Sequence, residues 1–133
     1  MDMERALLLV EDNDNDVILM KRALKIAQVK NPLHVVEDGQ KAIDYLSGTG
    51  LYADRAAHPR PGLVFLDLKL PFKSGHEVLG WIRQQPHLAD LAVVILTSSN
   101  QPSDLQEAYR LKANSYVTKP ASPEQLAELV KAF

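Results

Sequence analysis

The sequence predicts a single doubly wound α/β domain, with five parallel strands in one sheet and helices on both faces. Short apolar runs alternate five times with segments of helical periodicity along the chain. Three of these runs contain no polar residue, which is typical of parallel strands that helices cover on both sides. No linker or internal repeat interrupts the pattern, so we expect one domain over residues 1–133.

The first half of the chain contributes two strand–helix pairs. Residues 6–10 (ALLLV) are the first expected strand, and apolar residues three and four apart predict a helix over residues 15–28. Residues 34–36 (HVV) are the second expected strand, and Asp38 is the expected N-cap of the helix GQKAIDYL that follows. Residues 47–62 are rich in glycine and proline, which predicts an exposed loop.

The third and fourth pairs follow this loop. Residues 63–66 (LVFL) are the third expected strand, and Ser74 and Glu77 have the spacing of a capping box at the start of the next helix. Residues 92–96 (AVVIL) are the fourth expected strand, and we expect a helix at about residues 102–112 after it.

The last pair carries the strongest helix start signal. Residues 115–117 (SYV) are the fifth expected strand. Ser122, Pro123 and Gln125 then fit the N-cap, first and third positions of a helix. Proline suits the first helical position because the N–H that it lacks has no partner within the helix.

Composition excludes several classes of function. The net charge of −2 gives no general attraction for nucleic acid or an anionic membrane. The absence of cysteine excludes disulfides, thiolate zinc sites and a cysteine nucleophile. No apolar run approaches the length of about 18 residues that suggests a membrane span, and the acidic N-terminus does not resemble a signal peptide. We therefore expect a cytoplasmic protein that binds neither nucleic acid nor membrane.

Chemically active side chains follow four of the five expected strands. Because doubly wound sheets bind ligands beyond the carboxyl ends of their strands, we expect these side chains to meet at one edge. The set contains three carboxylates, a hydroxyl and an ammonium group: Glu11, Asp12, Asp67, Thr97 and Lys119.

Three clustered carboxylates favour a bound cation. At about 6 Å and an effective dielectric of about 20, each pair repels by about 3 kcal/mol, and a divalent cation removes this repulsion. Oxygen ligands without sulfur favour Mg²⁺. A carboxylate beside Mg²⁺, a hydroxyl and a lysine can accept a phosphoryl group, because these groups share its developing charge. Asp14 and Asp16 are expected to interact with the N-terminus of the first helix instead.

The order and spacing of these motifs resemble the receiver domains of two-component response regulators, over essentially the whole chain. Asp67 and Thr97 are 30 residues apart, and Thr97 and Lys119 are 22 apart, which fits that family. The matching segments are VED (10–12), LDLKLP (66–71), ILTSS (95–99) and SYVTKP (115–120).

The resemblance implies a CheY-like (flavodoxin-like) fold and a phosphoacceptor signalling protein that is not an enzyme acting on other substrates. It implies that Asp67 accepts a phosphoryl group from a histidine kinase. It also implies that Mg²⁺ binds Glu11, Asp12, Asp67 and the backbone carbonyl of Lys69. Because no DNA-binding segment follows in the sequence, we expect a single-domain regulator that acts through protein contacts.

The resemblance further implies a switch in which Lys119 contacts the phosphoryl group. Thr97 would move toward this group, and the Tyr116 ring would rotate inward from an exposed position. The Lys119–Pro120 peptide would be cis. The signal would leave through the face of the fourth helix, fifth strand and fifth helix, by changing homodimer contacts or the affinity for a downstream protein.

Three segments also resemble the small single-domain regulators of bacterial and cyanobacterial phytochromes: residues 34–46, 51–54 and 110–120. This resemblance implies a phytochrome-type histidine kinase as the partner and a light-signalling pathway. Members of that group often have a longer C-terminal tail that makes dimer contacts. The sequence ends at Phe133, which argues against a dimer of that kind.

Two other functions remain open. The first is a Mg²⁺-dependent phosphatase with an aspartyl-phosphate intermediate, similar to the haloacid dehalogenase group, but Lys69 stands where those enzymes have a second acid. The second is a receiver that serves only as a scaffold or phosphate relay, against which the complete set of site residues argues. The histidines share no metal-like spacing, and we expect them to be structural or surface residues: His34, His58, His76 and His87.

Overall fold

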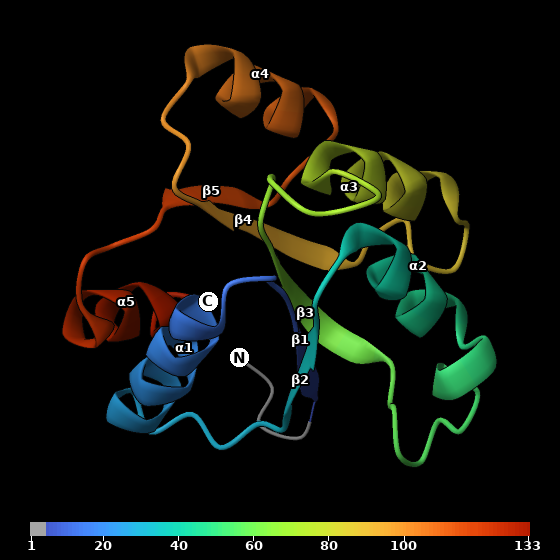
Figure 1. Cartoon of the computed structure of the whole chain (residues 1–133), viewed down its shortest axis with the longest axis horizontal. Helices are drawn as coiled ribbons and strands as arrows, with labels where there is room; N and C mark the ends of the chain where they lie inside the picture. Colours follow the sequence, from blue (N-terminus) through green and yellow to red (C-terminus); the bar gives the residue numbers. More distant parts are fainter. Residues whose placement is uncertain (1–4) are drawn as a thin grey trace.

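Five parallel strands form the central sheet, in the order β2-β1-β3-β4-β5 (Figure 1). The computed structural model describes residues 5–133. The strands are β1 (Ala6–Val10), β2 (Leu33–Val36), β3 (Pro61–Leu66), β4 (Ala92–Thr97) and β5 (Ser115–Thr118). The order reverses at β1, so that β1 and β3 are neighbours although β2 lies between them in sequence. The predicted fold class is therefore confirmed.

Five helices cover the sheet on both faces, with α1 and α5 on one face and α2, α3 and α4 on the other (Figure 1). None of the helices within residues 5–133 is both long and apolar enough to cross a membrane. The helices are α1 (Asp14–Ile26), α2 (Gly39–Ser47), α3 (Gly75–Gln84), α4 (Pro102–Arg110) and α5 (Pro123–Val130).

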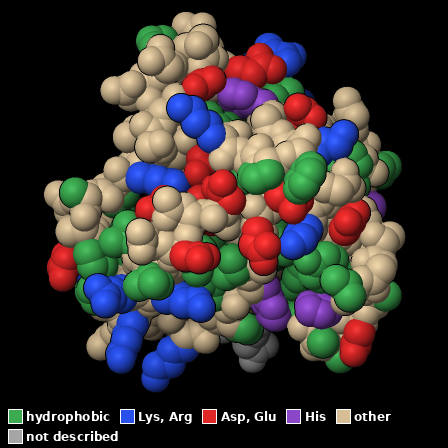
Figure 2. All heavy atoms as spheres, viewed as in Figure 1, with side chains coloured by type: hydrophobic (Ala, Val, Ile, Leu, Met, Phe, Trp, Pro, Cys, Tyr) green, Lys and Arg blue, Asp and Glu red, His purple; other side chains and the backbone are tan. Residues whose placement is uncertain are grey.

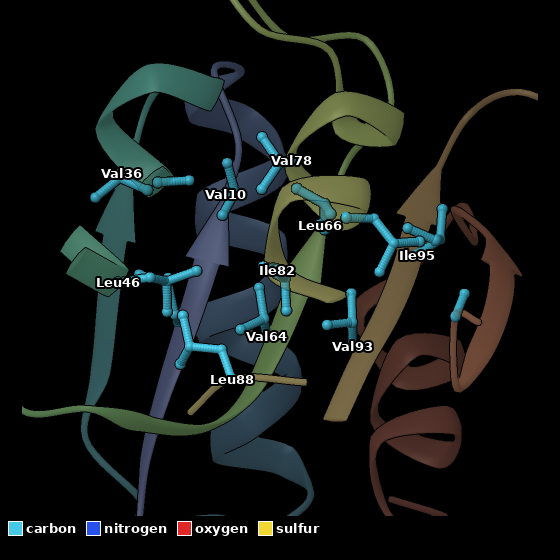
Figure 3. Packing of buried hydrophobic residues seen from close by; sticks show 14 of the residues in the cluster. Val10, Val36, Leu46, Val64, Leu66, Val78, Ile82, Leu88, Val93 and Ile95 are labelled. Carbon is cyan, nitrogen blue, oxygen red and sulfur yellow. The ribbon is translucent and has the colours of Figure 1, made fainter. Parts of the chain in front are cut away.

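Each strand supplies side chains to two hydrophobic cores, because successive residues of a strand point to opposite faces. In β1, Leu7 and Leu9 pack in the core beneath α1 and α5, whereas Leu8 and Val10 pack beneath the other helices. Figure 3 shows this second core, in which Ile82 of α3 lies against the sheet. Burial of one such side chain stabilises the fold by about 1.5–3 kcal/mol.

The predicted helix starts at Asp38, Ser74 and Ser122 are confirmed. The side chain of Asp38 accepts a hydrogen bond from the Lys41 N–H at 2.7 Å, and the two serines accept equivalent bonds at 3.2 Å. The first helix begins earlier than predicted, at Asp14, because the Asn13 side chain caps it. Asparagine is a preferred N-cap residue, so this start could have been found in the sequence.

The segment 47–62 is more ordered than an exposed loop. It contains a 3₁₀ turn, η1 (Gly50–Tyr52), and its last two residues begin β3. Arg55 anchors it by donating a hydrogen bond to the Tyr45 carbonyl at 2.7 Å. The rings of His34 and His58 each lie 5.9 Å from the Tyr45 ring, so these two histidines have the structural role predicted for them.

Candidate functional site

Buried polar side chains lie at the carboxyl ends of three neighbouring strands. Glu11, Asp67 and Thr97 are only 3%, 6% and 0% exposed. The sheet positions both acids, since the Glu11 N–H bonds to the carbonyl of Val36 and the Asp67 N–H to that of Val10. Because β1, β3 and β4 are adjacent, the side chains that follow them meet at one edge.

Lys119 brings a positive charge among the carboxylates. Its ammonium nitrogen lies 2.7 Å from a Glu11 oxygen and 2.8 Å from an Asp67 oxygen. It also lies 2.7 Å from an oxygen of Asp16 in the first turn of α1. Burial lowers the pKa of Lys119, but the hydrogen bonds to these three carboxylates outweigh burial and raise the pKa above its usual value. The side chain is therefore charged at neutral pH, and its three N–H groups match three acceptors.

The Asp67 carboxylate is held ionised by its hydrogen bonds. One oxygen accepts the backbone N–H of Leu68 at 2.7 Å, and the other accepts Lys119 at 2.8 Å. Burial raises the pKa of Asp67, but the side chains of Lys119 and Thr97 donate hydrogen bonds that hold the pKa below its usual value. An ionised carboxylate with oriented donors around it can act as a nucleophile.

Glu11, Asp12 and Asp67 form a cluster that fits a hard divalent cation. One oxygen from each lies within 4.8 Å of the others. Magnesium–oxygen bonds of about 2.1 Å place the ligands of an octahedral site roughly 3–4 Å apart, so small side-chain movements would complete the site. Burial raises the pKa of Glu11 to about 7, and a bound cation would favour its ionised form. Asp12 is exposed and opens the cluster to solvent.

Gly75 allows α3 to approach the end of β3 closely. A side chain at this position would place its Cβ 2.2 Å from the Asp67 carbonyl oxygen, so only glycine fits. The Gly75 N–H donates to the Leu68 carbonyl at 2.9 Å, which fixes the turn that follows Asp67. Sequence reasoning missed this residue, although a glycine at a predicted helix start was a usable signal.

The structure brings together the site residues predicted from the strand ends, while their chemical roles stay predictions. Asp14 and Asp16 lie in the first turn of α1 as predicted, but Asp16 also belongs to the site through Lys119. The Lys69 side chain is exposed, and its N–H lies 3.4 Å from an Asp67 oxygen. The role of the Lys69 carbonyl as a metal ligand stays a prediction.

Two expectations about the switch region are wrong. Tyr116 is not exposed but half-buried, and its hydroxyl donates to the Ser99 carbonyl at 2.9 Å. The ring packs against the core beneath α2, α3 and α4, so it already points inward. The Lys119–Pro120 peptide is trans, as are all the peptide bonds of residues 5–133. The trans form is the favoured one before proline, by about 0.5–1 kcal/mol.

The chain matches a known family over nearly its whole length. The family model described as the response regulator receiver domain matches residues 7–131. The response regulator Rcp1 of Synechocystis sp. is 38% identical over 129 residues, which cover 97% of this chain and 86% of Rcp1.

Solved structures give the same result. The phosphorylated cyanobacterial phytochrome response regulator RcpA is 40% identical, with a TM-score of 0.87 and coverage of 97% of this chain and 90% of RcpA. The Mn²⁺-bound form of Rcp1 is 38% identical, with a TM-score of 0.84 and coverage of 96% of this chain and 90% of Rcp1.

Proposed function

The chain belongs to the response regulator receiver domain family, whose members take phosphoryl groups from histidine kinases, and we propose that Asp67 is the residue that receives the group. The observation that carries this assignment is the environment of the Asp67 carboxylate. It is an ionised side chain at a strand end, it lies 2.8 Å from the Lys119 ammonium, and it belongs to the cluster with Glu11 and Asp12.

The bonds that form and break in the transfer involve only Asp67 and the phosphohistidine of the kinase. An Asp67 oxygen attacks the phosphorus of a phosphohistidine, the new O–P bond forms as the P–N bond breaks, and the imidazole leaves with the electron pair. Lys119 and Thr97 then donate hydrogen bonds to the phosphoryl oxygens. The lowered pKa of Asp67 keeps its carboxylate free of a competing proton.

We assign the cation site to Glu11, Asp12 and Asp67, with the Lys69 carbonyl as a fourth ligand and Mg²⁺ as the ion. The all-oxygen donor set supports a hard cation, and the Mn²⁺-bound structure of Rcp1 is a divalent ion complex of a relative. A cation bound here would neutralise charge on the phosphoryl oxygens during transfer.

The likeness to RcpA, a cyanobacterial phytochrome response regulator, supports a phytochrome-type histidine kinase as the donor in a cytoplasmic light-signalling pathway. The output is a change in protein contacts on the face formed by α4, β5 and α5, made with a downstream protein or a second copy of the chain. Tyr116 and Thr97 couple this face to the site, since Tyr116 bonds to the Ser99 carbonyl two residues after Thr97.

Labelling by acetyl phosphate tests the assignment of Asp67. With Mg²⁺ we expect one phosphoryl group per chain. We expect no labelling when a chelator removes the Mg²⁺, and none in the Asp67→Asn variant. That variant should keep the circular dichroism spectrum of the parent. Full labelling of Asp67→Asn would contradict the assignment. Rapid turnover of small phosphate esters would instead favour the phosphatase hypothesis. That hypothesis requires an acid at position 69, where this chain has a lysine.

A further inference from the structure

The loop between β3 and α3 presents an aromatic side chain to solvent beside the phosphoryl site. Phe72 is 86% exposed and comes five residues after Asp67. We propose that Phe72 is the anchor by which the phosphohistidine-bearing domain of the kinase docks on this chain. This inference rests on the proposed function, because it assumes that a kinase delivers the phosphoryl group to Asp67.

The backbone of Phe72 has an unfavourable conformation as well. Its φ of 67° lies in the left-handed region, where the side chain of an L-residue crowds the following carbonyl. Gln28 and Lys112 also have positive φ, but each follows the end of a helix, where this conformation is common. Phe72 instead is the central residue of a tight turn, in which the Lys73 N–H donates to the Pro71 carbonyl at 2.8 Å. The turn explains the backbone but not the phenyl ring, which contributes little burial. We therefore attribute the exposed ring to contact with a partner.

The groove next to Phe72 indicates the chemistry of the partner. Phe72 and Pro71 line a groove of about 630 Å³ together with four carboxylates and a lysine: Asp12, Asp14, Glu37, Asp38 and Lys41. The lysine is paired with Glu37 at 3.0 Å, so the groove is acidic. Figure 2 shows acidic side chains gathered across the middle of the face in view. The complementary surface is an apolar pocket for a phenyl ring with lysine or arginine around it.

The depth of Asp67 explains why a protein donor would cover this groove. Asp67 is only 6% exposed, and Asp12 belongs both to its cation cluster and to the groove wall. A phosphohistidine on a folded domain must therefore bring the surrounding surface of that domain over the site rim. Acetyl phosphate is small enough to enter without such contact. Comparing the transfer rates from the kinase and from acetyl phosphate therefore separates docking from the phosphoryl chemistry.

The main test compares Phe72→Ala with the parent chain, using each of the two phosphoryl donors in turn. A panel of autophosphorylated histidine kinases, with phytochrome-type kinases included, identifies the kinase that labels the parent fastest. With that kinase we expect transfer to Phe72→Ala to be slower by about thirtyfold, as for an interface hot spot. We expect the acetyl phosphate rate to stay within about twofold of the parent. Leu51→Ala, which removes a side chain that is 83% exposed on η1, is the control for lost apolar surface.

A second variant separates the ring from its backbone conformation. Phe72→Gly removes the left-handed strain, so the melting temperature should rise by about 3 °C while kinase transfer falls as in Phe72→Ala. Gln28→Gly relieves the strain at a remote turn with φ 58° and should leave transfer unchanged. A loss of stability in Phe72→Gly would show that the ring supports the fold and would contradict docking.

Charge reversal tests the chemistry of the partner. Glu37→Lys should slow kinase transfer by about three- to tenfold at low salt and less at high salt. Glu128→Lys on α5 is the matched control, because both glutamates are exposed and each pairs with a lysine three or four residues further along the chain. Equal kinase rates for Phe72→Ala and the parent would overturn the docking role, and so would an equal loss with both donors. A parent chain that neither donor labels would instead refute the proposed function.

Discussion

The helices α1 and α4, on opposite faces of the sheet, are attached in different ways. On one face, α1 is joined to the end of β5 by the ion pair between Asp16 and Lys119, and it shares a core with α5. On the other face, α4 buries only Ala108. Polar contacts to Asp104 hold the start of α4, where the Ser99 hydroxyl donates to its carboxylate at 2.5 Å and a His76 ring nitrogen lies 3.1 Å from its carbonyl.

This difference indicates which side of the molecule moves when Asp67 changes. A change at Asp67 reaches both layers, through Lys119 on one side and through Thr97 and Ser99 on the other. The α1 and α5 layer resists movement because apolar burial and the charged contacts of Lys119 both hold it in place. By contrast, α4 buries one side chain and depends mainly on a few hydrogen bonds, each of which contributes about 1 kcal/mol. We therefore expect α4 to carry the signal.

The largest expected effect comes from breaking the charged connection. Lys119→Met leaves Glu11, Asp16 and Asp67 without their shared cation, so chemical unfolding in a chelator should show a loss of about 3 kcal/mol. Mg²⁺ should restore part of this stability, because it binds the folded acids. Lys131→Met, which removes an exposed lysine, is the control. Parent-like stability in the chelator would contradict the importance of this connection.

The pKa of Glu11 gives the next effect. Burial raises this pKa to about 7, so Glu11 must lose a proton before it can bind a cation. Calorimetry should therefore show Mg²⁺ affinity about tenfold lower at pH 6 than at pH 8, with proton release on binding. The Glu11→Gln variant should bind more weakly and lose this pH dependence. Affinity that is constant from pH 6 to pH 8 would contradict Glu11 as a ligand.

The same pKa predicts how stability depends on pH without a cation. The folded state holds the Glu11 proton more tightly than the unfolded state, so the contribution of Glu11 to stability falls as pH rises from about 4.5 to about 7. His34 acts in the opposite direction, because burial lowers its pKa. The difference in stability between the parent and Glu11→Gln, followed over pH, isolates the contribution of Glu11.

Asp16 and Asp14 form a closely matched pair for a smaller effect. Both are acidic residues in the first turn of α1, but Asp16 contacts Lys119. Thermal unfolding should show that Asp16→Asn costs about 1 kcal/mol and Asp14→Asn about half of that or less. Equal costs would mean that the helix terminus, and not Lys119, accounts for the contribution of Asp16.

Two serines test the difference between α4 and the opposite face directly, with the smallest expected change. Ser99→Ala removes the bond to Asp104 and should speed hydrogen exchange in α4 with little loss of global stability. Ser122→Ala removes the N-cap of α5 and should lower global stability by about 1 kcal/mol. The reverse result would show that α4 is the firmly attached helix.

The sequence predicts the parts of this structure that local rules control. Neighbouring residues account for the strand alternation and for the caps at Asp38 and Ser122. Parallel pairing accounts for the sheet edge to which Asp67 and Lys119 belong. The role of Asp16 could not be predicted, because its partner lies 103 residues away and the helix terminus already explained an acid there.

The orientation of Tyr116 could not be predicted from the sequence for a similar reason. Its inward position depends on the core and on the Ser99 carbonyl, which the local pattern SYV does not describe. The trans Lys119–Pro120 peptide shows that a feature taken from a family resemblance need not appear in the structure.

Locating the phosphoryl group on the chain tests the central claim most directly. The protein is incubated with acetyl phosphate and Mg²⁺ and reduced with borohydride, which converts an aspartyl phosphate to homoserine, and its peptides are mapped by mass spectrometry. We predict homoserine at position 67 in the Mg²⁺ sample and none in the chelated sample. Modification at another residue, or unmodified Asp67 in a fully folded protein, would contradict the account.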